Sequence, residues 1–202
     1  MRRLRKFAIL FLSIAAAAGL AQKDKGGFSP GPISSFENKQ TISGVTIAAR
    51  VLETDEEAKP AFGKLNPYEH GILPVLVMMS NETKQPVKLN EMKVQYMLPD
   101  QSRIDATPAE EVQYARGPER PNMKPNPLPI PRRAKKNPLA TFEIEGRAFA
   151  AKMLLPGETA HGFFYFQTRH RIGSQLYISG LREAASGTEL FFFEIPLTRA
   201  GR

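Results

Sequence analysis

Short apolar stretches separated by polar turn residues recur along most of this 202-residue chain. Apolar side chains occupy every second position of residues 45–51. This pattern predicts a half-buried strand, because successive side chains of a strand point to opposite faces. Residues 72–79 are almost continuously apolar and end in the polar turn 80–84. A run of this length bounded by turn residues predicts a central strand that is buried on both faces.

The alternation of apolar positions changes parity near Asn90. Val87 and Leu89 follow one alternation, whereas the apolar positions of residues 92–98 follow the other. Because a shift by one residue turns every side chain to the opposite face, this change predicts a bulge or a break in the strand. We expect residues 104–114 to continue as a weaker strand or an edge strand.

Three later segments are rich in aromatic and branched residues and predict strands: residues 163–166, 176–181 and 190–195. The last of these fits either an internal core strand or an open edge that pairs with another chain. Residues 141–154 fit either a strand or a helix. Several short strands with turn signals between them predict an all-β domain, an antiparallel sandwich or barrel, over residues 41–198.

The N-terminal residues follow the order of a secretory signal. Four cations lie within residues 2–6, and residues 7–20 contain no charge. Small residues then precede a cleavage site before Gln22, which predicts a signal peptide over residues 1–21. An uncleaved anchor is the alternative, but the apolar run is shorter than the ~20 residues of a membrane-spanning helix. Residues 22–40 are polar and rich in glycine and proline, which predicts a flexible linker.

The chain contains no cysteine. Disulfides, thiolate metal sites and a lipid-modified N-terminal cysteine are therefore excluded. Together with the predicted signal, this indicates a protein of the bacterial periplasm, cell surface or exterior that has no lipid anchor. We also expect no transmembrane span after cleavage.

The net charge of +8 is unevenly distributed. The predicted signal peptide carries +4, and residues 115–139 carry seven cations and one acid, a net charge of +6. The rest of the chain is therefore at 8 − 4 − 6 = −2. A nucleic-acid-binding domain usually carries its positive charge along a face of the folded unit, so this distribution argues against nucleic acid as a partner.

Residues 115–139 also contain seven prolines, which exclude a helix interior or a central strand. We expect an extended, basic, proline-rich loop inserted in the β domain. Such a loop is a candidate binding segment for an anionic envelope component or an acidic protein face. A solvated insertion without a partner is the alternative. Its basic side chains are Arg116, Arg120, Lys124, Arg132, Arg133, Lys135 and Lys136.

Two parts of the chain resemble a known group of domains. Residues 72–89 form an apolar run, an asparagine turn and a Pro-Val pair, and residues 96–100 follow as Tyr-Met-Leu-Pro-Asp. Residues 155–166 combine a Leu-Pro-Gly-Glu-Thr corner with a glycine–aromatic strand. These segments resemble exported bacterial immunoglobulin-like (telokin-like) domains of secreted antigens and surface lipoproteins. The resemblance implies an immunoglobulin-like antiparallel β-sandwich with a binding or accessory role and without catalytic residues.

Signals for enzyme chemistry are few. His161, His170 and Glu158 flank the predicted strand 163–166 and are candidates for a metal site, although their spacing matches no metal-binding motif. The chain lacks a Gly-x-Ser-x-Gly nucleophile motif and a phosphate-binding glycine loop. We therefore expect no cofactor and no enzymatic activity.

The sequence thus predicts an exported, non-enzymatic binding or structural domain of the bacterial cell envelope. A metal-dependent or carboxylate-based envelope hydrolase is the first alternative. A subunit of an envelope protein complex is the second. The sequence does not specify the ligand or the oligomeric state.

Overall fold

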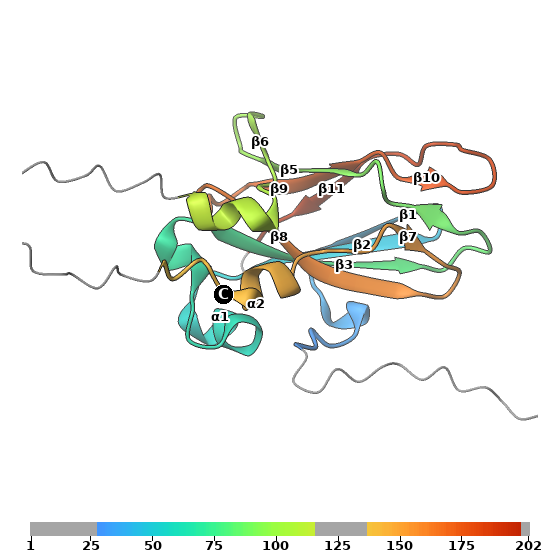
Figure 1. Ribbon diagram of the computed structural model, residues 1–202. Helices are drawn as coiled ribbons and strands as arrows, with labels where there is room; N and C mark the ends of the chain where they lie inside the picture. Colours follow the sequence, from blue (N-terminus) through green and yellow to red (C-terminus); the bar gives the residue numbers. More distant parts are fainter. Residues whose placement is uncertain (1–27, 116–136, 199–202) are drawn as a thin grey trace, which may run out of the picture.

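The computed structural model describes residues 28–115 and 137–198 (Figure 1). The predicted signal peptide and the seven basic side chains of the proline-rich segment lie outside the described residues. The described part is rich in antiparallel strands, with a few short helices.

The central sheet contains four antiparallel strands. Its order is β1 (Lys39–Ile42), β2 (Val45–Val51), β3 (Leu73–Asn81) and β8 (Thr159–Phe166). All nine residues of β3 are buried, with β2 on one side and β8 on the other. This confirms the prediction that the apolar run at residues 72–79 is a central strand buried on both faces.

A second antiparallel sheet packs on one face of the central sheet. Its order is β11 (Phe193–Pro196), β9 (Gln175–Ser179), β5 (Lys93–Met97) and β6 (Arg103–Asp105). Apolar side chains from the facing sides of both sheets form the main core. The sandwich is therefore held together by the alternating positions that the sequence predicts.

A small third sheet belongs to one end of the sandwich, at the right in Figure 1. It joins β10 (Arg182–Glu183), β4 (Val87–Lys88) and β7 (Met153–Leu154). The strands β4 and β5 thus belong to different sheets. The change of parity near Asn90 is therefore a strand break rather than a bulge.

Short helices form a layer on the other face of the central sheet. This layer includes α1 (Asp55–Phe62), α2 (Phe142–Gly146), and the 3-10 turns η1 (Ile33–Ser35) and η3 (Ala109–Tyr114). A further 3-10 turn, η2 (Pro67–His70), precedes β3. The second core cluster joins side chains of this layer to the central sheet: Phe36, Ala48, Leu52, Ala58, Ala61, Phe62, Ile72, Leu76, Met78, Val112, Leu139, Ile144, Phe163 and Tyr165.

The helices correct the prediction of an all-β domain. The acidic stretch at residues 53–57 opens α1 through a capping box, in which the Thr54 hydroxyl accepts from Glu57 N (3.3 Å) and the Glu57 carboxylate accepts from Thr54 N (3.0 Å). Both residues satisfy backbone donors that a helix start otherwise leaves unpaired.

The structure also defines three segments that the sequence left open or placed differently. The expected strand 104–114 is only β6 at its start, because Pro108 ends the extended segment and η3 follows. Residues 141–154 contain both a short helix, α2, and a short strand, β7. In the predicted linker, Phe36 is 4% exposed and β1 begins at Lys39, so the packed part of the chain begins before residue 41.

The segment 190–195 contributes the core strand β11. Phe193 and Ile195 are fully buried. Although β11 lies at the end of its sheet, it packs beside β1, where its Glu194 N donates to the Gln40 side-chain carbonyl (2.8 Å). The interpretation as a core strand is therefore confirmed, and a neighbouring strand of the same chain covers this edge.

Candidate functional site

The outer face of the second sheet points away from the main core. In one row across this sheet, Glu194, Tyr177, Gln95 and Asp105 are register neighbours. The next row along, which includes Tyr96, points inward and is buried. Because strand side chains alternate, the row of Tyr177 is directed outward.

A stack of side chains lies on this outer face, with Arg103 exposed and Tyr177 partly buried between its neighbours. The Arg103 guanidinium lies over the Tyr177 ring, 3.9 Å from its centroid. The Phe192 ring stacks on Tyr177 with centroids 5.4 Å apart and an interplanar angle of 26°. Phe192 is 48% exposed, and its neighbour Phe191 is 75% exposed. We call Arg103, Tyr177 and Phe192 the aromatic face.

Polar side chains hold the aromatic face in place. The Gln95 amide donates to the Asp105 carboxylate (2.7 Å), and Arg103 donates to the Gln95 carbonyl oxygen (3.4 Å). The cation–π contact of Arg103 adds ~0.5–1 kcal/mol at an exposed position. Asp105, Gln95, Arg103 and Tyr177 are therefore joined in one network of polar and aromatic contacts across strands β6, β5 and β9.

A depression of about 490 Å³ lies at the end of strands β5 and β9 of this sheet, beside β10. Its lining includes Lys93 and Ser179, which are register neighbours two residues along β5 and β9 from Gln95 and Tyr177. Two residues keep the same face of a strand and span ~7 Å. The depression is therefore a continuation of the outer face that carries the aromatic stack.

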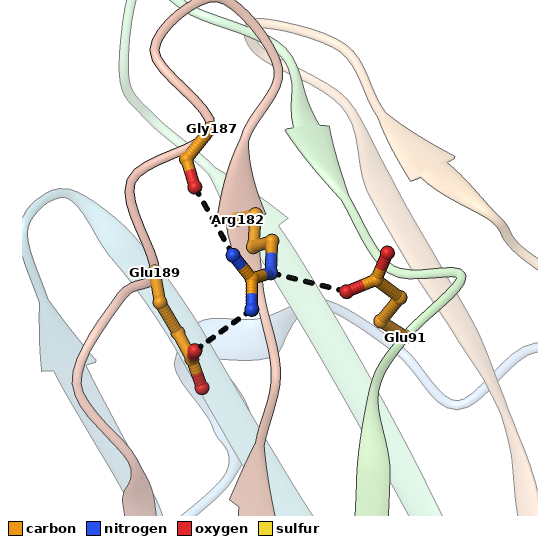
Figure 2. A network of polar contacts seen from close by, with 4 residues as sticks. All are labelled: Glu91, Arg182, Gly187 and Glu189. Carbon is orange, nitrogen blue, oxygen red and sulfur yellow. Dashed lines mark hydrogen bonds and ion pairs between the residues drawn. The ribbon is translucent and has the colours of Figure 1, made fainter.

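One arginine joins three segments around the depression. Arg182 Nε is paired with Glu91 (3.1 Å), and one terminal nitrogen is paired with Glu189 (3.1 Å). The other terminal nitrogen donates to the Gly187 carbonyl (3.4 Å) (Figure 2). These contacts make Arg182 a clamp for the 183–189 loop and for the turn that carries Glu91.

A close backbone contact fixes one wall of the depression. Gly180 has φ +79°, and a Cβ atom added there would lie 2.4 Å from the Glu91 carbonyl oxygen. Only glycine allows this conformation together with this approach. The turn that carries Glu91 is thus held against the end of β9.

The candidate metal ligands do not converge. His161 is exposed on β8, and the Glu158 carboxylate accepts a hydrogen bond from Leu155 N (3.0 Å). His170 follows the far end of β8, and the six residues from His161 to Phe166 alone span ~16 Å. Among residues 28–115 and 137–198, no group of three or more His, Cys, Asp or Glu side chains is placed to hold a metal ion.

His170 instead contacts a buried tyrosine. The fully buried Tyr96 accepts a hydrogen bond at its hydroxyl from Arg171 N (2.9 Å), so its own proton is free to point to His170 Nδ1 (2.9 Å). The Tyr68 hydroxyl accepts from His170 N (3.2 Å). These bonds fasten the loop after β8 to the sandwich, which is a structural role.

Both flanks of the basic segment are described. The Asn137 side chain donates to the Gln113 carbonyl, and its carbonyl oxygen accepts from Leu139 N (3.0 Å). Leu139 is buried in the second core cluster.

In the described ranges, no helix has the length and apolar character needed to cross a membrane.

The sequence contains one signal for the aromatic face. Within residues 190–195, Phe193 and Ile195 alternate with Phe192 and Glu194. A strand with its core side at Phe193 places Phe192 outward. The approach of Arg103 is set by the pairing of β6, β5 and β9, which local periodicity does not predict.

The chain was compared with known proteins. No family model matches it, and no curated protein matches it. Two solved structures resemble it distantly. One is a "putative lipoprotein (ycdA)" of Bacillus subtilis subsp. subtilis str. 168, with a TM-score of 0.37 and 10% identity over 78% of this chain. This chain covers 38% of that protein's length.

The other is a functionally unknown protein of Listeria monocytogenes EGD-e, with a TM-score of 0.33 and 10% identity over 79% of this chain and 82% of that one. These likenesses assign no family. The predicted export and the predicted absence of a lipid anchor stay predictions.

Proposed function

We propose that this protein is an exported, non-enzymatic binding domain of the bacterial cell envelope, and that it binds its partner through the aromatic face. The observation that carries the proposal is the ordered Arg103–Tyr177–Phe192 stack on an open sheet face. Tyrosine and arginine are the residue types that contribute most to binding where they are presented in an ordered arrangement.

The side chains of the Arg103–Tyr177–Phe192 stack are not part of the main core. Tyr177, Phe192 and Arg103 lie on the solvent side of the second sheet, whereas the core is formed by the inward residues of the same strands. Phe192 is 48% exposed and Tyr177 is partly exposed, which forgoes part of the stabilisation that their burial would give, ~25 cal/mol per Å². A partner that covers them recovers this free energy, which favours a binding role for the face.

Export and envelope location rest on the N-terminal signal pattern and the absence of cysteine. In this proposal the immunoglobulin-like part is the sandwich of the two larger sheets, and the helical layer is an addition to it. The basic segment is a separate proposal, in which it docks an acidic protein or an anionic envelope component. Its test is independent of the aromatic face.

The test is a pull-down from envelope extract with the mature chain as bait. Three baits are compared: the natural chain, Tyr177→Ala and Tyr114→Ala. Tyr114 is a matched control because it is 71% exposed but lies on η3, away from the second sheet. We expect retention of envelope material to be lost for Tyr177→Ala and unchanged for Tyr114→Ala. Equal retention by all three baits refutes the proposal, provided that their thermal unfolding curves agree.

A further inference from the structure

We infer that the hydrogen bond between Tyr96 and His170 is an acid-sensitive latch, which holds the 167–174 loop against the sandwich at neutral pH and releases it at acidic pH. This loop joins the end of β8 to the start of β9. The inference goes beyond the proposed function, because Tyr96 lies on the inward side of the second sheet and the latch requires no partner.

Two tyrosines hold the loop. On one side, the Arg169 guanidinium donates to Tyr68 O (2.9 Å) and lies over the Tyr68 ring, 4.7 Å from its centroid. On the other side, His170 Nδ1 lies 2.9 Å from the Tyr96 hydroxyl, which also accepts from Arg171 N (2.9 Å). Histidine is the residue type in this set that ordinarily changes its charge between pH 5 and 8. The contact of His170 with Tyr96 is therefore the pH-dependent one.

The Tyr96 hydroxyl determines which form of the histidine ring fits. Tyr96 is fully buried and its oxygen accepts from Arg171 N, so its own proton is directed to His170 Nδ1. Nδ1 accepts this bond only where it carries no proton. A protonated ring carries N–H groups on both nitrogens and places two donors against each other. The buried proton of Tyr96 then loses its acceptor, which weakens the closed conformation by roughly tenfold or more.

The charges around His170 act in the same direction. Arg169 and Arg171 are its neighbours along the chain, so protonation creates three successive cations. Asp100 is the acidic group that faces this part of the loop. Hydrogen bonds from Ser102 lower the pKa of its exposed carboxyl, and the charge of Arg171 adds to this shift. One carboxylate offsets only part of the three positive charges, so the neutral ring is favoured.

The pH range follows from the favoured form. Because the folded chain holds His170 neutral, the closed loop is fully stabilised above ~pH 6.5, where an ordinary imidazole is neutral, and loses this stabilisation as the pH falls. Two further titratable residues, Glu69 and His70, follow Tyr68 on η2. The experiment therefore substitutes His170 alone, so that its effect is separated from theirs.

Release of the latch changes the surface at this end of the sandwich. The loop carries Ile172, which is 95% exposed and follows Arg171 directly. The Tyr96 ring packs beside the fully buried Phe166, with centroids 5.7 Å apart. Once the His170 ring moves away, water reaches the Tyr96 hydroxyl and the edge of the main core. At acidic pH the loop thus becomes mobile while the sheets stay paired.

The experiment measures amide hydrogen exchange of the mature chain by NMR at ~pH 7.5 and ~pH 5, on either side of the ordinary histidine titration. Rates are corrected for intrinsic exchange. The amide of Arg171 reports on the latch, because it donates to the Tyr96 hydroxyl. We expect its protection factor to fall at least tenfold at the lower pH, while the amides of β3 keep theirs.

Two variants assign the effect to one ring. In His170→Gln, a side-chain oxygen that stays neutral replaces Nδ1 as the acceptor, so we expect equal protection of the Arg171 amide at both pH values. His161→Gln is the matched control, because His161 is exposed on β8. We expect it to show the same tenfold loss as the natural chain.

Equal protection of the Arg171 amide at both pH values in the natural chain overturns the inference. A loss that persists in His170→Gln also overturns it, because another group is then the one that titrates. A loss shared by the amides of β3 indicates general acid unfolding and has the same consequence. A second measurement needs no variant: the ring resonances of His170 should titrate at a lower pH in the folded chain than in urea, and an equal or higher midpoint contradicts the latch.

Discussion

Substituting Gly162 by alanine tests the contact between β8 and the segment that follows α2. A Cβ atom at Gly162 would lie 2.4 Å from Phe149 Cα and 2.6 Å from Phe149 N. Both are backbone atoms, so the segment itself has to move. The movement strains two hydrogen bonds, from Phe149 N to Phe163 O (3.1 Å) and from Phe163 N to Arg147 O (2.8 Å).

The expected cost follows from these contacts. Overpacking costs ~1–3 kcal/mol, and each hydrogen bond contributes ~0.5–1.5 kcal/mol, so Gly162→Ala is expected to lower the free energy of unfolding by ~2–6 kcal/mol. With a urea dependence of ~2 kcal/mol per M, the unfolding midpoint falls by ~1–3 M. Equilibrium urea unfolding of the mature chain, followed by circular dichroism, measures this shift.

Gly146→Ala is the matched control. A Cβ atom there would lie 3.0 Å from Cε1 of Phe142, which is the far end of a side chain that is 84% exposed and free to rotate away. Alanine also favours a helix by up to ~1 kcal/mol over glycine. We expect an unchanged or slightly higher midpoint. Equal midpoints for Gly162→Ala and the natural chain refute the reasoning about the close contact.

Three further perturbations test other parts of the structure. Asn81 donates to Gln85 O (2.8 Å) and to Leu154 O (3.0 Å), so Asn81→Asp places a buried carboxylate against two carbonyls; we expect a loss of ~3 kcal/mol in urea unfolding that is smaller at acidic pH. Burial raises the pKa of Tyr165 far above its ordinary 10.0, so the contribution of this hydroxyl to stability is complete below pH 10 and is lost as the pH rises further. Tyr165→Phe should therefore lose less stability at alkaline pH than the natural chain does, which urea unfolding at several pH values measures. Substituting the four cations of residues 132–136 by glutamine should weaken any salt-sensitive retention of envelope material, and unchanged retention at low salt contradicts a docking role for the basic segment.

The sandwich strands are predictable because their signal is local. Strands with one buried face carry apolar residues at every second position, and the fully buried β3 is a continuous apolar run. The run at residues 72–79 indicates that both faces of β3 are covered, but the pattern is the same whether a sheet or helices cover them. The helical layer was therefore missed.

The start of α1 did carry a signal. Thr54 and Glu57 have the spacing of a capping box, but the helix is short and contains Pro60, which removes one backbone donor. These features hide the helical pattern in the sequence. The packing of Phe62 against Phe163, with centroids 4.8 Å apart, shows why the helix forms: tertiary contacts stabilise it.

The candidate site was beyond sequence reasoning for a different reason. Arg103 and Tyr177 are 74 positions apart, and only the order β9-β5-β6 brings them into contact. The candidate ligands His161 and His170 are near each other in the sequence, but β8 separates them. His161 lies near the start of this strand and His170 follows its end. Long-range register determines both outcomes.

The most direct test of the account is the retention of envelope material by the mature chain in a pull-down, measured for the natural chain, Tyr177→Ala and Tyr114→Ala. The account predicts retention that is lost for Tyr177→Ala and unchanged for Tyr114→Ala. No retention by the natural chain, or equal retention by all three proteins, contradicts it.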